Sequence, residues 1–587
     1  MDPYFRPVSL EPANKKAPTS PEKKRKAKSP PVTPPHTPQR RPKGPAGSAA
    51  SDENVVMNKA TQTPTAKAKK EKVDHSQRQN ITRIHNKWYD LTGFVHPGGP
   101  VAQSLAEGRD GTALFVAHHP FSDPKKMDAV LAKYEVSEDE VKSRNLTATI
   151  LRDDDHGEDY QWTWSDPFEI ELKKEVKQYF EKEAKRRGVS FFQATKATPK
   201  RWLEILALTC LFLATLPSLI AGETWTLVAT PITCWVWMVN YWHDACHFAL
   251  CRVWWINASL PYAGIWFSSP TTWYHQHVIG HHAYPNMDHK DPDLAHAPQM
   301  LREHCSVRWK PAHRAQHRWY RFTAVWAIAV GLVRLRSPPT PRHKFGFVWA
   351  DSCHCRLNCS QGLHLAADTK LLLQHEYNRA VTKTPSYRKS SNVAWHVFGR
   401  MVYIFTTFVW PWLVFESYLQ RLIFSTVPIV IFSLAFMINS QINHLTPDTA
   451  HAHESNYYRH QVATAQDFGD GGWFHNGYCF IMSGGLNFQI EHHVSLCSIP
   501  KPVILSSLSL TDLSCGWMDR LQQQLFPTVC HCHLSSIKPI VKRLCEKHGV
   551  PYHQRYGYSD ALEEHFAHSH LMGEMKYERE SDKLKTK

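Results

Sequence analysis

The hydrophobic residues of this chain gather in a few long runs that polar stretches separate. Two runs, Leu203–Ala221 and Thr224–Trp242, each approach the roughly 20 residues that a helix needs to cross a bilayer. A second pair spans Met401–Phe415 and Leu422–Gln441, with the polar turn Glu416–Arg421 between its members. The pattern therefore predicts four membrane helices arranged as two hairpins.

Two shorter apolar stretches lie between the hairpins. Val253–Pro270 is rich in Trp, Tyr and Pro, which is typical of a helix at the membrane–water interface. Phe322–Leu335 is apolar but too short to span a bilayer, and we expect it at the interface as well.

The flanking regions are polar. Residues 1–73 are rich in Pro, Lys, Ser, Thr and Ala and lack hydrophobic periodicity, so they cannot bury enough surface to offset chain entropy, and we expect a disordered basic tail. Residues 138–200 form a charged connector in which opposite charges recur at helical spacing over Glu169–Lys185. Residues 557–587 form a charged carboxyl-terminal tail.

The net charge of +16 comes more from the basic amino-terminal tail, residues 1–73, than from the folded part of the chain. A run such as Lys23–Lys26 is typical of a solvated segment, so we expect no nucleic-acid partner, with anionic lipid as the alternative. No apolar segment within the first thirty residues resembles a cleaved secretory signal. The cysteines are scattered without CxxC pairs, which indicates a reducing compartment. The Cys530–His533 run is too tightly spaced for one tetrahedral zinc and is interpreted as ordinary side chains.

Three histidine clusters accompany the apolar runs. His243 and His247 are spaced i, i+4, which places both on one face of a helix. His277 and His281 repeat that spacing, and His282 is expected to turn toward a second ion. A final pair, His492 and His493, follows Gln489. Imidazole suits iron, zinc or copper, and the number of histidines favours two metal ions over one.

The topology predicts that these clusters meet. Lys200 and Arg201 precede the first helix, so the positive-inside tendency places the amino terminus in the cytosol. Each hairpin then returns the chain to that side, at His243 and at His444. We interpret the remaining histidines between the clusters and near the end as surface or outer groups: His275, His289, His296, His304, His313, His317 and His475.

A separate histidine pair lies nearer the amino terminus. His96 stands in an His-Pro-Gly-Gly motif, and His118 and His119 follow a short helical segment. Two histidines just over twenty residues apart can hold a flat cofactor from both faces. The segment resembles the cytochrome b5 family, which implies a small α+β domain over residues 74–137 with His96 and His119 as axial ligands of haem b, and His118 as the runner-up. The family's usual strand ahead of Tyr89 is not evident, so we expect an incomplete domain edge.

The combination of HxxxH, HxxxHH and QxxHH with an amino-terminal cytochrome b5-like domain resembles the front-end membrane fatty acyl desaturases. The resemblance covers roughly Trp88 to Tyr556. It implies a mainly α fold with a four-helix transmembrane desaturase domain over residues 201–556 and a cytosolic histidine-rich cap. It also implies a di-iron centre that uses O2 to introduce a cis double bond into an acyl chain, between an existing double bond and the carboxyl end.

Carried over residue by residue, the resemblance gives a set of iron ligands: His243, His247, His277, His281, His282, His444, His492 and His493. Gln489 stands at a ligand position but is a poor iron ligand, so an outer or water-holding role is expected. Asp244 and Glu491 are predicted to orient imidazoles, and Asp291 and Asp293 to be structural. Apolar walls are predicted to limit entry of the acyl chain: Trp266, Phe267 and Trp273.

The resemblance also predicts the partners. They are two non-haem iron ions, haem b, O2, a fatty acyl lipid or acyl-CoA, membrane lipids, and an NADH-linked cytochrome b5 reductase as electron donor. The expected location is the endoplasmic reticulum membrane, with a plastid membrane as the alternative. Three other functions stay open: a sphingoid-base desaturase, a hydroxylase on the same scaffold, and an inactive membrane haem carrier. The position of the double bond is not determined.

Two stretches depart from the family pattern. In the family, QxxHH is followed at once by Leu-Phe-Pro, whereas here residues 494–524 intervene before Leu525. Residues 334–364, rich in Pro and Cys, are similarly atypical. Each is interpreted as a real loop or as a translated intron, and we expect the 494–524 stretch to reduce activity by separating His493 from the segment that follows it in the family.

Overall fold

The computed structural model describes residues 80–119, 121–146, 162–264, 270–288, 290–295, 301–318, 390–470, 472–494 and 529–574. The predicted basic tail, the 334–364 stretch, all of the 494–524 stretch except Val494, and the predicted interfacial helix Phe322–Leu335 lie outside these residues. Of the predicted carboxyl-terminal tail, residues 557–574 are described, and most of them are helical.

The small amino-terminal domain is built on an antiparallel hairpin. Strand β1 (Ile81–Ile84) pairs with β2 (Lys87–Asp90), with Ile81 opposite Asp90. The strand that the sequence did not reveal ahead of Tyr89 is therefore present. Leu146 packs with Ile81 and Val136 in one small core, so the domain extends past the predicted boundary at residue 137. Four short helices accompany the hairpin: α1 (Gly99–Leu105), α2 (Thr112–His118), α3 (Pro124–Leu131) and α4 (Glu138–Ser143).

The connector contains a helix that belongs to the main core. Helix α6 (Pro167–Arg187) begins at the N-cap Asp166 and ends at Gly188, whose φ of 62° closes the helix in the left-handed region. Its buried positions Phe168, Leu172 and Val176 recur at helical spacing, and they pack in the same core as α22 (Leu534–His548). The short α7 (Phe191–Ala194) leads from α6 into the long helices.

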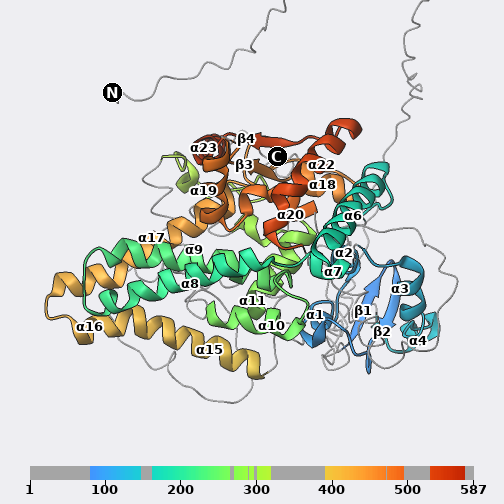
Figure 1. Ribbon diagram of the computed structural model, residues 1–587, viewed down its shortest axis with the longest axis horizontal. Helices are drawn as coiled ribbons and strands as arrows, with labels where there is room; N and C mark the ends of the chain where they lie inside the picture. Colours follow the sequence, from blue (N-terminus) through green and yellow to red (C-terminus); the bar gives the residue numbers. More distant parts are fainter. Residues whose placement is uncertain are drawn as a thin grey trace, which may run out of the picture. The chain divides into compact units, whose positions relative to one another are not determined.

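The long apolar helices lie side by side (Figure 1). Helix α9 (Thr226–Cys246) packs against both α8 (Pro199–Ile220) and α17 (Tyr418–Gln441). The predicted third span is part of a longer run comprising α15 (Ser390–Ile404), the π-helical η6 (Phe405–Val409) and α16 (Trp410–Val414). Among the described residues, α8 and α17 are the helices long and apolar enough to cross a membrane.

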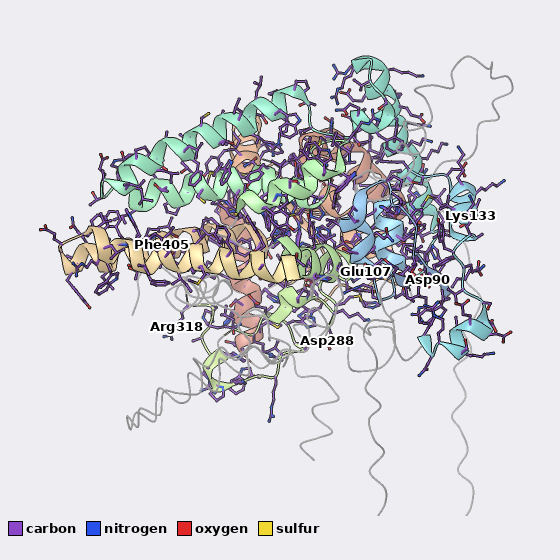
Figure 2. The ribbon with its side chains drawn as sticks, turned by 90° about the horizontal axis from the view of Figure 1, so that it is seen from below. Asp90, Glu107, Lys133, Asp288, Arg318 and Phe405 are labelled. Carbon is purple, nitrogen blue, oxygen red and sulfur yellow. The ribbon has the colours of Figure 1, made fainter. Side chains whose placement is uncertain are left out.

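Large apolar side chains remain exposed along these helices. Leu203 on α8 is 66% exposed, Leu413 on α16 is 72% exposed, and Phe405 on η6 is 49% exposed. Figure 2 labels Phe405 on the helical run that contains η6. Monomeric soluble proteins seldom expose such contiguous apolar surface, so this belt is suited to contact with lipid.

The predicted interfacial helix Val253–Pro270 is broken rather than continuous. It consists of α10 (Trp254–Ser259) and the 3-10 helix η2 (Leu260–Gly264), with residues 265–269 outside the described part. The chain then enters α11 (Pro270–Trp273), the π-helix η3 (Tyr274–His281), and the 3-10 turns η4 (Pro292–Ala295) and η5 (Pro311–His313).

A cap of short elements lies above one end of the long helices in the view of Figure 1. It holds a two-stranded parallel sheet in which β3 (Gln466–Phe468) pairs with β4 (His553–Arg555). The helices of the cap are α18 (Tyr457–Ala463), α19 (Trp473–Ser483), η7 (Leu486–Phe488), α20 (Gln489–Val494), η8 (His531–His533), α22 and α23 (Tyr558–Gly573). Val494 and Val529 share one core although 34 residues of chain, outside the described part, connect them.

Candidate metal centre

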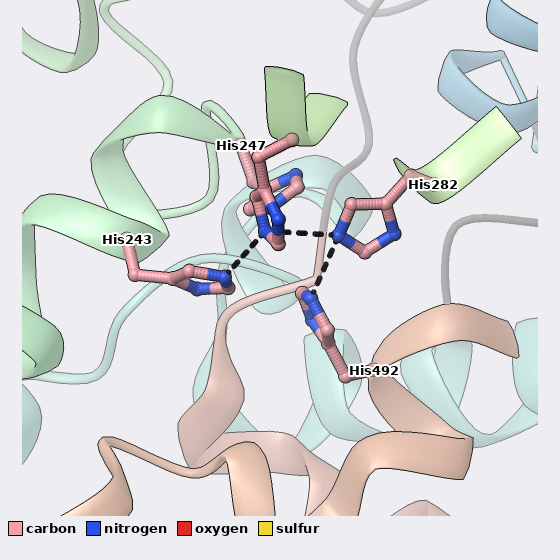
Figure 3. A group of neighbouring side chains, drawn as sticks. His243, His247, His282 and His492 are labelled. Atoms are coloured by element: carbon pink, nitrogen blue, oxygen red, sulfur yellow. Dashed lines mark hydrogen bonds between the residues drawn. The ribbon is translucent and has the colours of Figure 1, made fainter. Parts of the chain in front are cut away.

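Histidine side chains from four parts of the chain converge in one buried region. The first histidine group has five members, whose ligand nitrogens all lie within 4.8 Å of one another: His243, His247, His277, His282 and His492. The second histidine group meets the same criterion with three members: His281, His444 and His493. Figure 3 shows the rings of His243, His247, His282 and His492 directed toward one another. The structure thus brings together every histidine that the resemblance implied as an iron ligand.

The spacing of the nitrogens within each group is that of ligands around one ion. In the first group, Nε2 of His277 lies 2.8 Å from Nε2 of His243 and 3.2 Å from Nε2 of His282. In the second group, Nε2 of His444 lies 3.2 Å from Nε2 of His281 and 3.1 Å from Nε2 of His493. Two nitrogens bound to one metal at about 2.0–2.1 Å lie about 3 Å apart.

The helix that carries HxxxHH differs from the prediction. His277 shares the first group with His282, and His281 belongs to the second group, so the expected pairing of His277 with His281 was wrong. The reason is local geometry, because η3 is a π-helix with i→i+5 hydrogen bonding rather than an α-helix. A π-helical turn brings residues five apart onto one face and turns His281 toward the other group.

The outer nitrogens of the second group are all held by acceptors. Nδ1 of His281 lies 3.0 Å from Asp291, Nδ1 of His444 lies 2.8 Å from the Thr464 carbonyl, and Nδ1 of His493 lies 2.6 Å from Gln461 Oε1. A neutral imidazole that donates from Nδ1 presents a lone pair at Nε2. Three such nitrogens facing one another need a proton or a metal cation between them, so these residues fit a metal ion.

The surroundings of His247 indicate that the first group also fits a metal ion. Its side chain is 2% exposed, and neither ring nitrogen has a hydrogen-bond partner among the described residues. Buried polar atoms are almost always satisfied in native proteins, and a metal ion at Nε2 would supply the missing partner.

Asp291 has a larger role than the structural one expected from the sequence. Burial by itself lowers the pKa of His281, but the nearby carboxylates of Asp291 and Asp293 outweigh it and raise that pKa to about 9. Burial acts to raise the pKa of Asp291, yet His281 and backbone N–H donors lower it overall. Asp291 also accepts from the backbone N–H of Asn286 at 2.8 Å. Such a carboxylate–histidine pair fixes the ring and strengthens it as a metal ligand.

The residue that the sequence interpretation missed is His531. Its Nε2 lies 3.0 Å from Nδ1 of His492, and its Nδ1 donates to the carbonyl of Gly484 at 2.6 Å, so Nε2 is free to accept from His492. A Cβ added at Gly485 would lie 2.8 Å from the Cβ of His531 and 3.0 Å from its ring. His531 lies in the Cys530–His533 run, which was interpreted from the sequence as ordinary side chains. The two histidines of that run were the signal that could have identified it as part of the site.

Two acidic residues predicted to orient imidazoles have different surroundings. Asp244 lies 3.1 Å from Nδ1 of His531 and accepts from Cys530 at 3.2 Å, so it lies behind His531. Glu491 contacts no imidazole among the described pairs and instead accepts from Tyr552 at 2.8 Å. Burial and the neighbouring Asp467 carboxylate raise the pKa of Glu491 well above its usual value. Glu491 immediately precedes His492 on α20, and the structure places it beside Tyr552 and Asp467 rather than beside the imidazoles.

Gln489 lies beside the second group. Its Nε2 is 2.8 Å from Nε2 of His444, and its Oε1 accepts from Asn443 at 3.3 Å. The amide therefore occupies the region where a fourth imidazole would complete the group, which is compatible with the outer or water-holding role expected from the sequence.

A narrow cavity touches both groups. Its lining includes His243 and His277 of the first group, His281 and His444 of the second, and Gln489. Its apolar walls are formed by Trp235, Met238, Trp242, Trp273 and Phe436. Trp273 is therefore placed where the sequence expected a wall, whereas Trp266 and Phe267 lie outside the described residues.

The histidine pair of the amino-terminal domain lines a second, apolar cavity. The ring centroids of His96 and His119 lie 5.9 Å apart, and both rings border the cavity together with Leu114, Phe115 and Leu131. Nδ1 of His119 lies 2.7 Å from the Phe115 carbonyl, which leaves Nε2 as the ligand atom. Burial lowers the pKa of His96 to about 3 and that of His119 to about 4, so both rings are neutral near pH 7. His118 borders the same cavity.

Phe248 connects this apolar cavity with the first histidine group. It borders the cavity and directly follows His247 in the chain. Its φ of 56° lies in the left-handed region, which is costly for a bulky residue and is kept only where the surroundings impose it. The ammonium of Lys196, itself 1% exposed, donates to the Phe248 carbonyl at 3.0 Å. The fold thus maintains a strained aromatic residue between the two sites.

Fold and site together define a helical protein with an exposed apolar belt and two buried histidine groups that could each hold a metal ion. A family model described as fatty acid desaturase matches residues 217–354. Over these residues the chain is therefore similar to the fatty acid desaturase family.

Relatives extend the similarity over most of the chain. The "Delta(5) fatty acid desaturase A" of Dictyostelium discoideum is 24% identical over 84% of this chain and 90% of its own length. The "Acyl-lipid (8-3)-desaturase" of Physcomitrium patens is 25% identical over 84% of this chain and 87% of its own. The enzyme of the same name from Mortierella alpina is 23% identical over 84% of this chain and 93% of its own length. No solved structure matches the chain.

Proposed function

We propose that this protein is a front-end fatty acid desaturase, an oxidoreductase that uses O2 to introduce a cis double bond into a lipid acyl chain. The observation that carries the proposal is the pair of histidine groups, which present inward-facing nitrogens about one metal-ligand spacing apart. The desaturase names of the relatives support the same reaction class.

Two non-haem iron ions are the metals we assign to the groups. The first group would hold one ion through five imidazoles and the second would hold the other through three, with Gln489 beside it. Bound iron would supply the activation of O2 that removal of hydrogen from an unactivated methylene requires. The protein's part is to fix the rings, through Asp291 at the second group and His531 at the first.

The acyl chain is proposed to enter the cavity that borders both groups. The cavity walls Trp242, Trp273 and Phe436 are apolar, and the metal-facing side carries the histidines. Met238 borders both this cavity and a larger apolar cavity among α8, α9, η6 and α17. A chain bound past Met238 would therefore extend between the long helices, and the depth of that space would set which carbons reach the metals.

Electrons are proposed to arrive through the amino-terminal domain. A haem b held by His96 and His119 would occupy the apolar cavity that Phe248 borders. Phe248 borders the haem cavity and is covalently linked to His247, so electrons would have a short route from the haem through Phe248 to the first histidine group. Fusion keeps the donor at high effective concentration. An NADH-linked cytochrome b5 reductase would reduce the haem.

The exposed apolar belt supports a membrane location, for which we propose the endoplasmic reticulum with the amino terminus in the cytosol. Helices α8 and α17 are long and apolar enough to span. We propose that α9 and the α15–α16 run complete the four-helix arrangement, since α9 packs directly between α8 and α17.

Expression in a host that lacks polyunsaturated lipids tests the function. Candidate fatty acids and sphingoid bases are supplied, and new double bonds are located by mass spectrometry. We expect products two hydrogens lighter than the substrate with the wild-type chain and with the exposed-site control His453→Ala, and none with His444→Ala. Products that gain oxygen would indicate a hydroxylase instead. Purified protein that binds haem but no iron would indicate a haem carrier.

A further inference from the structure

A third cluster of potential metal ligands lies outside the two histidine groups. Ligand atoms of His304, Cys305 and His451 all lie within 4.8 Å of one another. The Cys305 sulfur is 3.9 Å from both ring nitrogens of His304 and 3.9 Å from Nδ1 of His451. His304 is 6% exposed, so the interpretation of it as a surface or outer group is incomplete. His451 is exposed, so the cluster is reachable from solvent.

The spacing of this cluster is close to that of ligands around one metal ion. The ring centroids of His304 and His451 lie 5.1 Å apart, and those of His247 and His492 in the first histidine group lie 5.0 Å apart. With Zn–N bonds of about 2.0–2.1 Å and a Zn–S bond of about 2.3 Å, sulfur and nitrogen on one tetrahedral ion lie about 3.5 Å apart. The observed separations exceed this by a few tenths of an ångström, which side-chain rotation can close.

A fourth residue adds an independent indication. His568 on α23 is 1% exposed, and its Nδ1 has no hydrogen-bond partner among the described residues. Its Nε2 donates to the carbonyl of Glu303 at 2.6 Å, which leaves Nδ1 as an acceptor. Its ring lies 5.8 Å from that of His451. A buried nitrogen without a hydrogen-bond partner next to the cluster can accept a hydrogen bond from a metal-bound water.

We propose that His304, Cys305 and His451 bind a zinc ion, with His568 accepting from a zinc-bound water at the fourth position. The donor set of imidazoles with one thiolate favours zinc over the oxygen-preferring magnesium and calcium. Binding replaces the thiol proton of Cys305, which leaves to solvent. His304 would bind the zinc ion through Nε2. Its Nδ1 would then donate a hydrogen bond to the Ser306 hydroxyl, 2.9 Å away, and would no longer accept one from the Ser306 backbone N–H. This site does not depend on the proposed function.

The ion would hold together three segments around the second histidine group. Arg302 donates to the Met572 carbonyl on α23 at 3.1 Å. His565, also on α23, bonds to the carbonyl of Leu445 at 2.8 Å, and Leu445 directly follows His444. A zinc site between residues 304–305 and His451 would therefore secure the loop after α17 and the helix α23 that packs on it. We assign it a structural role.

Metal analysis of the full-length protein in detergent tests the site. Cells are grown with zinc, and zinc and iron are measured in the same purified sample. We expect about one zinc per chain in addition to iron. Cys305→Ser and His451→Ala should lose the zinc and keep the iron, whereas Cys210→Ser, at an exposed cysteine of α8, and His453→Ala, at an exposed histidine two residues from His451, should keep both.

A second measurement uses the unaltered chain and so does not depend on the folding of a variant. Zinc should protect Cys305 from alkylation, and a chelator should remove the protection. The extent of alkylation at Cys305 is measured by mass spectrometry of the labelled peptides. Cobalt substituted for zinc should give a thiolate-to-metal charge-transfer absorption that Cys305→Ser abolishes. Equal zinc in wild type and both ligand variants, or equal labelling of Cys305 with and without zinc, would overturn the proposal.

Discussion

The two histidine groups differ in both composition and surroundings. The first has five imidazoles, is backed by His531, and adjoins Phe248 and the apolar cavity of the amino-terminal domain. The second has three imidazoles, is backed by the charged Asp291, and has Gln489 in place of a further imidazole. With fewer imidazoles and a neutral amide beside it, the second group leaves more room for a small ligand or water. Under the proposed function, electrons would enter at the first group, and the second would be the more open to O2.

Removing a ligand from either group should have the largest effect. His247→Ala and His444→Ala should each lower desaturation by at least about 100-fold, because ligand loss exceeds the 10–100-fold typical of outer residues. Each variant should lose about one of two irons, measured by metal analysis. Loss of both irons from one variant and none from the other would contradict two separable sites.

The outer carboxylate of the second group should come next. Asp291→Asn removes the charge that holds His281, and we expect activity to fall by about 10–100-fold with weaker retention of iron on dialysis. Asp293→Asn is the matched control, since Asp293 is 3.6 Å from His281 and partly exposed. Equal effects of the two substitutions would show that Asp291 has no special role.

His531, which supports the first group, is neutral, so its removal should lower activity less than the removal of the charged Asp291. His531→Phe deletes the acceptor of the His492 proton and should lower activity by about tenfold, at the lower end for outer ligands. His531→Gln can supply an amide oxygen to His492 and should recover much of the loss. Failure of Gln to improve on Phe would indicate that His531 acts only by filling space.

Phe248 tests the electron route to the first group. Phe248→Ala should slow reoxidation of the reduced haem by about tenfold in stopped-flow measurements, because the donor and acceptor lose their fixed contact. Phe248→Gly removes the same ring while relieving the positive φ, so a similar slowing would assign the effect to the ring. Unchanged reoxidation in both variants would exclude this route.

The smallest effect concerns acid stability near the second group. His460 bonds to the carbonyl of Pro285, next to the Asn286 that contacts Asp291. Burial lowers the His460 pKa from 6.5 to about 4, so the unfolded chain binds more protons between these values. Stability should therefore fall as pH drops from about 6.5 to about 4, by up to about 3 kcal/mol from this residue. His460→Gln should flatten the decrease in melting temperature between pH 7 and pH 5.

Much of the long-helix arrangement was predictable because it depends on local hydrophobic runs. The predicted Leu203–Ala221 and Leu422–Gln441 agree with α8 and α17 to within four residues at either end. The third run was misjudged because α15 begins at Ser390, before the hydrophobic signal rises. The strand β1 was missed because four residues of a hairpin carry too little pattern to be recognised.

At the site, too, some features were predictable from the local sequence and others were not. The histidine motifs identified the imidazoles, but the π-helical η3 reassigned His281 and His282, and no spacing rule for an α-helix could anticipate that. Helix phase separated Glu491 from the metal side, since neighbouring residues on α20 face about 100° apart.

By itself, the sequence determined which side chains can bind metal and which segments are apolar, because both are properties of residue type and local order. The tertiary structure decided how the imidazoles divide between two groups, and that Asp291, His531 and Phe248 surround them. These partners come from segments far apart in the chain, and only packing determines which of their atoms come within hydrogen-bonding distance.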